Sequence, residues 1–225
     1  MSRAVRHVLL DLDGTLTDSE EGIVRSMRHA LLTMQRPVPD DAALRRLIGP
    51  PTHETFRRLL GTDDMGSIDE AVRLYRERYA RVGLFENRLY PGVAEMLEAL
   101  RMLDCTLFLA TSKPIVYARR IVAHYGLTAH FAGLHGAEFD GTRADKTELI
   151  GHLLETERLD PEHCLMVGDR KHDILGARAN GVRTCSARWG YGEPDEIRAA
   201  APDFECFAAG ELPTVVRMLI AQASS

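Results

Sequence analysis

Short apolar runs recur along the chain and are separated by longer amphipathic segments. The clearest runs are 8–10, 106–110 and 164–167, and two weaker runs are 183–187 and 131–134. Strands that are buried on both faces of a parallel sheet show continuous apolar runs of this length. The pattern therefore predicts at least five strands in one buried parallel sheet.

Amphipathic segments between these runs predict helices over 93–103, 115–125, 146–157 and 174–180. In the first, Val93, Met96, Leu97 and Leu100 fall on one face, which is the spacing of a half-buried helix. Gly126 follows the second segment and is a typical helix stop. Alternating strands and helices predict a doubly wound α/β fold.

Residues 19–90 interrupt this alternation. They carry helical patterns over 19–34, 40–48, 52–60 and 68–82, and no convincing strand. We therefore predict an α/β core made of 1–18 and 91–225, with a helical domain, 19–90, inserted after the first strand. A domain inserted there is expected to act as a cap, with hinges at Asp18 and 89–92.

Composition excludes several classes of protein. The net charge of −5 over 225 residues argues against a nucleic-acid polymer as partner. No apolar run approaches the roughly 18 residues that span a bilayer, and residues 1–7 do not resemble a signal peptide. We expect no membrane association and a cytoplasmic location. The four cysteines form no Cys-x-x-Cys pair, which favours reduced, buried thiols over a zinc site.

Two carboxylates, Asp11 and Asp13, follow the first predicted strand directly. Ligands of open α/β sheets bind beyond the carboxyl ends of strands, and alternate residues of a strand share one side. One such carboxylate can attack while the other donates a proton. A solvated acidic turn or a helix cap is the ordinary alternative. A calcium loop is disfavoured because Leu16 and Ile23 stand where oxygen ligands are needed.

Polar residues also follow the later strands. Thr111 and Ser112 can bind a phosphate oxygen, Lys146 supplies a cation, and Asp169 and Asp173 can face a hard cation together. Taken singly, each residue also has a simpler explanation. The hydroxyls and the aspartates can cap helices, and the lysine can be a solvated surface charge.

Taken together, these segments resemble the haloacid dehalogenase superfamily. Its four motifs match, in order, at Asp11-Leu12-Asp13-Gly14-Thr15, at Thr111-Ser112, at Lys146 and at Gly168-Asp169 to Asp173. The resemblance spans residues 8 to about 192, and the insert 19–90 resembles the helical C1 cap of that superfamily. It implies a Rossmann-like core and a phosphatase that acts on a small phosphorylated metabolite.

The resemblance also implies the roles of the acidic residues. Asp11 would be the nucleophile that becomes an aspartyl-phosphate, and Asp13 would be the general acid and base. Mg²⁺ would be held by Asp11, by the main-chain carbonyl of Asp13, by Asp169, and by Asp173 directly or through water.

The remaining motif residues would hold phosphate. Thr111 and the amide of Ser112 would bind its oxygens, and Lys146 would neutralise both the phosphate and the nucleophile. Lys113 lies close to the second motif and is a rival for this role, or an assistant to Lys146. Two positions depart from the commonest pattern: Arg170 replaces a small hydroxyl residue, and Thr147 replaces a proline.

Two branches of the superfamily are similar to this chain. Ile48-Gly49-Pro50-Pro51 with Thr55-Phe56 resembles the phosphoglycolate phosphatases. The run 168–177, Trp189-Gly190-Tyr191-Gly192 and Arg143 resemble the bacterial 5'-nucleotidase-like members. The expected substrate is a small phosphate ester, phosphoglycolate or alternatively a nucleoside monophosphate. Arg45, Arg57 and 49–51 are candidate specificity residues, although the arginines also suit exposed helix faces. Trp189 either stacks on a base or packs a loop.

Other functions stay open at this point. A β-phosphoglucomutase-like phosphotransferase would use nearly the same residues. A metal-free dehalogenase would not need Asp13, Asp169 or Asp173, and a catalytically silent binding protein would be expected to lack one of the core residues. The sequence is compatible with a monomer or a homodimer.

Overall fold

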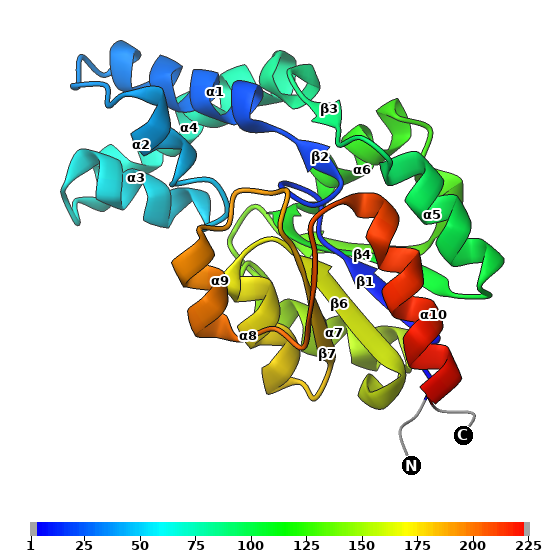
Figure 1. The fold of residues 1–225 in the computed structure, drawn as a ribbon. Coiled ribbons are helices and arrows are strands. Elements are labelled where there is room, and N and C mark those ends of the chain that lie inside the picture. Colours follow the sequence, from blue (N-terminus) through cyan, green and yellow to red (C-terminus); the bar gives the residue numbers. More distant parts are fainter. Residues whose placement is uncertain (1–3, 223–225) are drawn as a thin grey trace. The chain divides into compact units, whose positions relative to one another are not determined.

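The structure is a computed structural model that describes residues 4–222 (Figure 1). The chain divides into two compact units. The first, here called the core unit, comprises 1–17 and 89–225, and the second, the helical unit, comprises 18–88. That the helical unit serves as a cap stays a prediction.

A six-stranded parallel sheet forms the centre of the core unit, in the order β5-β4-β1-β6-β7-β8. The strands are β1 His7–Leu10, β4 Thr106–Pro114, β5 Phe131–Ala137, β6 Cys164–Gly168, β7 Arg183–Ala187 and β8 Phe204–Cys206. The predicted α/β fold is confirmed, and all five predicted apolar runs lie in strands. The edge strand β8 was not predicted, because three residues with a central glutamate give no apolar run.

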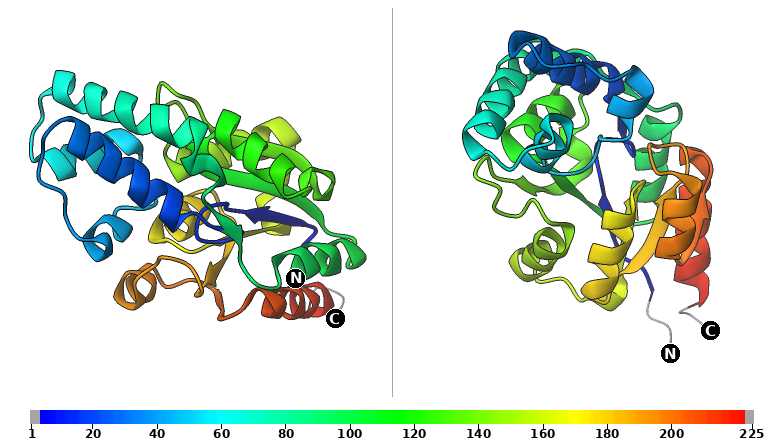
Figure 2. Two further views of the ribbon diagram at one scale, coloured as in Figure 1. Left: turned by 90° about the horizontal axis from the view of Figure 1, so that it is seen from above. Right: turned by 90° about the vertical axis from the view of Figure 1, so that its left-hand side faces the viewer.

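Helices cover both faces of this sheet (Figures 1 and 2). They are α5 Val93–Met102, α6 Ile115–His124, α7 Lys146–Glu157, α8 Lys171–Ala179, α9 Pro194–Ala200 and α10 Leu212–Gln222, with 3₁₀ turns η2 Thr128–His130, η3 Pro161–His163 and η4 Ala209–Glu211. Helix α7 packs against α8, and α5 packs against α10. Among the described residues, no helix has the length and apolar character that crossing a membrane requires.

The central strand β1 fixes where the functional residues meet. Leu10 is in register with Leu109 of β4 and with Val167 of β6, so the residues that follow these three positions lie at the same edge of the sheet. The Asp11 amide donates to the Val167 carbonyl at 3.0 Å and continues this pairing by one residue. The chain connects β1 to neighbours on opposite sides, and such a switch point is where open α/β sheets bind ligands.

The second motif lies differently from the prediction. The strand was expected to end at Ala110, but β4 continues to Pro114, and α6 begins at Ile115. The extension pairs Thr111 with Gly136 and Pro114 with Ala137 of β5, with an irregularity between the two pairs. Thr111, Ser112 and Lys113 therefore lie on an irregular strand end and not in a loop.

Four helices and a 3₁₀ turn build the helical unit: α1 Glu20–Thr33, α2 Asp41–Arg45, α3 Thr52–Leu60, α4 Met65–Arg81 and η1 Gly83–Phe85. All four helices were predicted, but α2 is shorter than the predicted 40–48. Two-residue strands, β2 Thr17–Asp18 and β3 Arg88–Leu89, pair with each other where the chain passes between the units. The prediction of no strand in 19–90 was wrong for β3, which is too short to give a pattern.

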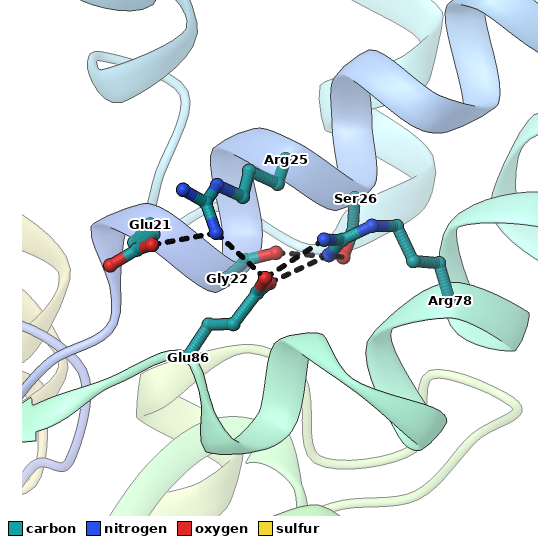
Figure 3. Close-up of polar contacts among 6 residues, drawn as sticks. All are labelled: Glu21, Gly22, Arg25, Ser26, Arg78 and Glu86. Carbon is teal, nitrogen blue, oxygen red and sulfur yellow. Dashed lines mark hydrogen bonds and ion pairs between the residues drawn. The ribbon is translucent and has the colours of Figure 1, made fainter.

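A polar network ties α1, α4 and the segment after η1 together (Figure 3). The Glu86 carboxylate accepts hydrogen bonds from Arg78 at 2.8 and 3.0 Å and from Arg25 at 2.9 Å. Arg78 also donates to the Ser26 hydroxyl, which donates to the Gly22 carbonyl at 2.7 Å. The hydrogen bonds from Arg78 lower the pKa of Glu86, so this carboxylate is ionised at neutral pH.

Candidate active site

Lys146 lies at the centre of the candidate site. It is the first residue of α7, and Asp145 caps this helix by accepting from the amides of Thr147 and Glu148. The buried Lys146 ammonium lies 2.9 Å from Asp11 Oδ1 and 2.7 Å from Asp173 Oδ1. Burial opposes its charge, but the two carboxylates outweigh burial and raise the pKa of Lys146 above its ordinary value.

The same ammonium also binds the sheet edge. Lys146 Nζ donates to the Ala110 carbonyl of β4 at 2.7 Å. One cation therefore links the first predicted motif, the strand that carries the second, and the fourth. The structure brings these segments together although they are far apart in the sequence, because they lie at or just beyond positions that are in register on neighbouring parallel strands.

Asp169 and Asp173 occupy the junction between β6 and α8. Both side chains are buried, and the Arg170 amide donates to Asp173 Oδ2 at 3.0 Å. Burial raises the pKa of Asp169 well above its ordinary value, and the charges of Asp173 and Asp11 add to this. Burial likewise raises the pKa of Asp173, with Lys146 opposing the shift and Asp11 reinforcing it. The carboxylates thus crowd one another.

These three acids can hold a cation. Asp11, Asp169 and Asp173 each offer an oxygen, and the three oxygens lie within 4.8 Å of one another. Asp169 Oδ1 is buried and has no hydrogen-bond partner among the described residues. A hard divalent cation would relieve both the crowding and this unpaired oxygen, and carboxylate oxygens are the ligands that Mg²⁺ prefers. The donor set therefore fits the predicted metal.

Asp13 lies in a different environment from Asp11. Its Oδ2 atom forms an ion pair with the buried ammonium of Lys113, while Oδ1 is buried without a hydrogen-bond partner among the described residues. Lys113 was predicted as a rival or assistant to Lys146. In the structure the two lysines contact different carboxylates: Lys146 contacts Asp11 and Asp173, and Lys113 contacts Asp13.

Thr111 and Ser112 lie at the same sheet edge. Thr111 follows Ala110, whose carbonyl binds Lys146, and its buried hydroxyl accepts from the Lys113 amide at 3.3 Å. Ser112 is half-buried. Their position at the end of β4 is compatible with the predicted contacts to phosphate oxygens, which stay a prediction.

Sequence reasoning missed several contacts around the site. Arg170, which departs from the commonest pattern, is a largely buried partner of Glu196 on α9, with Nε at 2.9 Å from the carboxylate. The Tyr191 amide donates to Asp169 Oδ2 at 2.7 Å, and the Trp189 indole donates to the Thr15 carbonyl at 3.0 Å. Trp189 thus packs a loop against the first motif. The only signal for these contacts was the glycine-rich run 189–192.

The predicted specificity arginines lie in the helical unit. Arg45 pairs with Glu20 and Arg57 with Asp63, each at 3.0 Å, and both arginine side chains are about half exposed, at 50% and 47%. Both therefore form surface ion pairs within their own unit. A role in selecting substrate stays a prediction for each of them.

The fold and this site define an α/β protein with a cluster of buried carboxylates, able to hold a hard cation, at the switch point of its sheet. The chain belongs to the haloacid dehalogenase-like hydrolase family, whose model matches residues 8–187. This confirms the resemblance that the four motifs indicated.

Relatives in this family carry different names. A 5'-nucleotidase of Pseudomonas aeruginosa is 49% identical over 200 residues, which cover 89% of this chain and 90% of the relative. The tyrosine-protein kinase PtkA of Mycobacterium tuberculosis is 44% identical over 191 residues, which cover 84% of this chain and 64% of the kinase. A phosphoglycolate phosphatase of Vibrio parahaemolyticus is 29% identical, with 94% of this chain and 96% of the relative covered.

Solved structures show the same architecture. The crystal structure of a predicted phosphatase from Clostridium acetobutylicum has a TM-score of 0.91 and 31% sequence identity to this chain. The match covers 96% of this chain and 99% of that one. The likeness therefore extends over both the core unit and the helical unit.

Proposed function

We propose that this hydrolase is a Mg²⁺-dependent phosphomonoesterase that works through an aspartyl-phosphate on Asp11. The observation that carries the proposal is the Lys146 ammonium, which contacts the Asp11 and Asp173 carboxylates 2.9 and 2.7 Å away. A buried cation beside a carboxylate nucleophile offsets the repulsion that an anionic phosphate would otherwise meet. Asp169 beside them completes a donor set for the metal.

In the first step, an oxygen of Asp11 attacks the phosphorus in line, and the bond from phosphorus to the ester oxygen breaks. Asp13, protonated, gives its proton to the departing alkoxide. The buried Asp13 Oδ1, which has no hydrogen-bond partner among the described residues, is the oxygen suited to that proton. Thr111 and the Ser112 amide would bind the equatorial oxygens.

In the second step, water attacks the phosphorus of the aspartyl-phosphate. Asp13, now a carboxylate, takes a proton from this water, and the bond to Asp11 breaks to give inorganic phosphate and free enzyme. Lys146 stays charged throughout and stabilises the negative charge that builds up on the phosphoryl oxygens. Lys113 holds Asp13 in place through its ion pair.

Mg²⁺ would be held by the carboxylates of Asp11, Asp169 and Asp173 and by the main-chain carbonyl of Asp13. When bound, it supplies positive charge that neutralises the phosphate and the crowded carboxylates. The remaining tasks, which are attack, proton transfer and positioning, fall to the side chains of this chain.

The substrate that we favour is a nucleoside 5'-monophosphate. The 5'-nucleotidase relative is 49% identical, against 29% for the phosphoglycolate phosphatase, over similarly large shares of the chain. The glycine-rich run 189–192 and Arg143 also resemble that branch. Phosphoglycolate is the second candidate, supported by the resemblance of 48–51 to the other branch.

The test is phosphate release from nucleoside monophosphates, phosphoglycolate and sugar phosphates, with and without Mg²⁺. Asp11→Asn removes the nucleophile. Asp104→Asn is the matched control, because Asp104 is exposed just before the amino end of β4 and has a φ of 57° that asparagine also tolerates. We expect Mg²⁺-dependent release that only Asp11→Asn abolishes, and label from a phosphorus-32 ester on the peptide that carries Asp11 after acid quenching.

Other outcomes would redirect the proposal. Isomerised sugar phosphate without release of phosphate would identify a phosphotransferase that uses the same residues. Transfer of label from ATP to tyrosine, again without release, would place the chain with the kinase relative. Activity retained in Asp11→Asn would overturn the aspartyl-phosphate route.

A further inference from the structure

The two oxygens of the Asp169 carboxylate have different surroundings. Oδ2 accepts the Tyr191 amide at 2.7 Å, whereas Oδ1 is buried and lacks a hydrogen-bond partner among the described residues. A main-chain donor does not depend on the tyrosine side chain, so the contact is set by the path of the loop. One oxygen is thereby fixed, and the other is left for a ligand.

The loop 189–192 follows β7 and lies directly against Asp169. A Cβ atom at Gly190 would lie 2.4 Å from the Asp169 Cβ atom and 2.2 Å from the Gly14 carbonyl, and one at Gly192 would lie 1.9 Å from the Asp169 carbonyl. These distances leave no room for a side chain. Only glycine at 190 and 192 lets the backbone come close enough for the Tyr191 amide to reach the carboxylate.

The same loop is joined to the first motif. Trp189 Nε1 donates to the Thr15 carbonyl at 3.0 Å. Gly14, one residue before Thr15, also lies against Asp169: a Cβ there would be 2.2 Å from Asp169 Oδ2, and its φ is +84°. The loop therefore bridges the turn that follows Asp13 and the carboxylate of Asp169, and it sets the spacing between them.

We propose that Trp189, Gly190 and the Tyr191 amide are positioning residues for Asp169, which hold one carboxylate oxygen so that the other faces a divalent cation together with Asp11 and Asp173. The inference rests on the metal site of the proposed function. It assigns to the loop a purpose beyond packing. A loop that only packs would affect folding stability and leave the affinity for metal unchanged.

The test measures metal binding without substrate, on the full chain. The probe is Mn²⁺, which shares magnesium's preference for oxygen ligands and is counted by the paramagnetic resonance signal of the free ion, followed by displacement with Mg²⁺. The variants are Gly190→Ala and Trp189→Phe. Gly210→Ala is the matched control, because a Cβ atom there meets nothing within 4 Å. Asp169→Asn gives the baseline for a lost ligand.

We expect Gly190→Ala to weaken Mn²⁺ binding by about 10- to 100-fold, the usual effect of disturbing a group that orients a metal ligand. Trp189→Phe keeps an aromatic side chain but loses the indole donor and some ring volume, and we expect a smaller loss than for Gly190→Ala. Gly210→Ala should bind as the wild type does. Thermal unfolding of the metal-free proteins separates the loss of affinity from loss of the fold.

Trp189 offers a second measurement because it is the single tryptophan of the chain. Binding of Mg²⁺ should change its fluorescence over the same concentrations that displace Mn²⁺, and Asp169→Asn should abolish this change.

Two results would overturn the inference. One leaves the metal site of the proposed function standing, and the other overturns that site as well. If wild type binds Mn²⁺ and folded Trp189→Phe and Gly190→Ala bind it equally well, only the inference fails. Should Gly190→Ala not fold, Trp189→Phe decides alone. If wild type binds no better than Asp169→Asn, the metal site of the proposed function fails together with it.

Discussion

Lys113 and Asp13 form a partly buried ion pair, while Lys146 contacts Asp11 on the same edge of the sheet. The two lysines therefore contact different carboxylates, although Asp11 and Asp13 are only two residues apart in the sequence. In the proposed mechanism, this pairing would give the lysines separate tasks. Lys146 would serve the carboxylate that attacks, and Lys113 would orient the carboxylate that moves protons.

Replacing each lysine by methionine should separate these tasks. Lys146→Met should lower kcat by about 10²- to 10³-fold on every ester, because it removes charge stabilisation at the phosphoryl group. Lys113→Met should lower kcat strongly on alkyl phosphates, whose leaving groups need a proton, and weakly on aryl phosphates. Steady-state kinetics on both ester types decides this.

Lys171→Met is the control for that pair, because the Lys171 side chain is exposed on α8. Its kinetics should match the wild type. If Lys113→Met and Lys146→Met lose the same factor on both ester types, the division of tasks is wrong.

Asp13→Asn should show the dependence on leaving group most clearly. Asparagine keeps the shape of the side chain but can neither donate the proton to an alkoxide nor take one from water. General acid–base catalysis contributes about 10²- to 10⁴-fold, so we expect a loss of that size on alkyl phosphates. On p-nitrophenyl phosphate the first step should survive and leave the aspartyl-phosphate to accumulate.

Rapid mixing with p-nitrophenyl phosphate measures this directly. Asp13→Asn should release one equivalent of nitrophenol in a burst, followed by slow turnover. A linear time course at the wild-type rate would show that Asp13 takes no part in proton transfer.

Sequence reasoning located the core strands because buried parallel strands consist of continuous apolar runs. It also predicted which side chains gather at one edge of the sheet, since residues after neighbouring parallel strands must meet there. It missed β3 and β8, which are too short for a pattern, and the extension of β4 through Ser112 and Lys113.

Contacts that depend on tertiary packing could not be predicted from the sequence. The ion pair between Arg170 and Glu196 forms only because α9 packs against α8, and no local sequence pattern predicts it. The same is true of the partner of Lys113. The sequence indicated a cation close to the second motif, but which carboxylate it faces depends on the irregular end of β4.

Gly22→Ala should destabilise the helical unit. A Cβ atom at Gly22 would lie 2.0 Å from the Gly83 carbonyl, which is backbone and cannot turn aside. Forcing α1 and η1 apart also disturbs the hydrogen bond from the Gly22 amide to the Glu86 carbonyl at 3.0 Å. We expect the free energy of unfolding to fall by about 1–3 kcal/mol, as for other overpacked sites.

Urea denaturation followed by circular dichroism measures this change. Gly66→Ala is the matched control, since Gly66 lies in α4 and a Cβ atom there would approach only Asp64 oxygens at 3.8 Å. Alanine in a helix should leave that variant as stable as wild type or slightly more stable. Equal stability of Gly22→Ala and wild type would contradict the close approach of α1 and η1.

The cysteines should resist alkylation in the folded protein, because all four are buried and free. Burial, with a smaller effect of Asp160, raises the pKa of Cys164 to about 12, and burial with Asp104 raises that of Cys105 to about 11. The thiolate is the reactive form, and at pH 8 only about one Cys164 in 10⁴ carries it. Iodoacetamide at pH 8 should therefore label neither residue in native protein and both in urea, as mass spectrometry of the peptides will show.

Raising the pH toward the pKa increases the thiolate fraction, so any native labelling should grow with pH and affect Cys105 before Cys164. Rapid labelling of Cys164 at pH 8 without denaturant would show that β6 is more accessible than the fold implies.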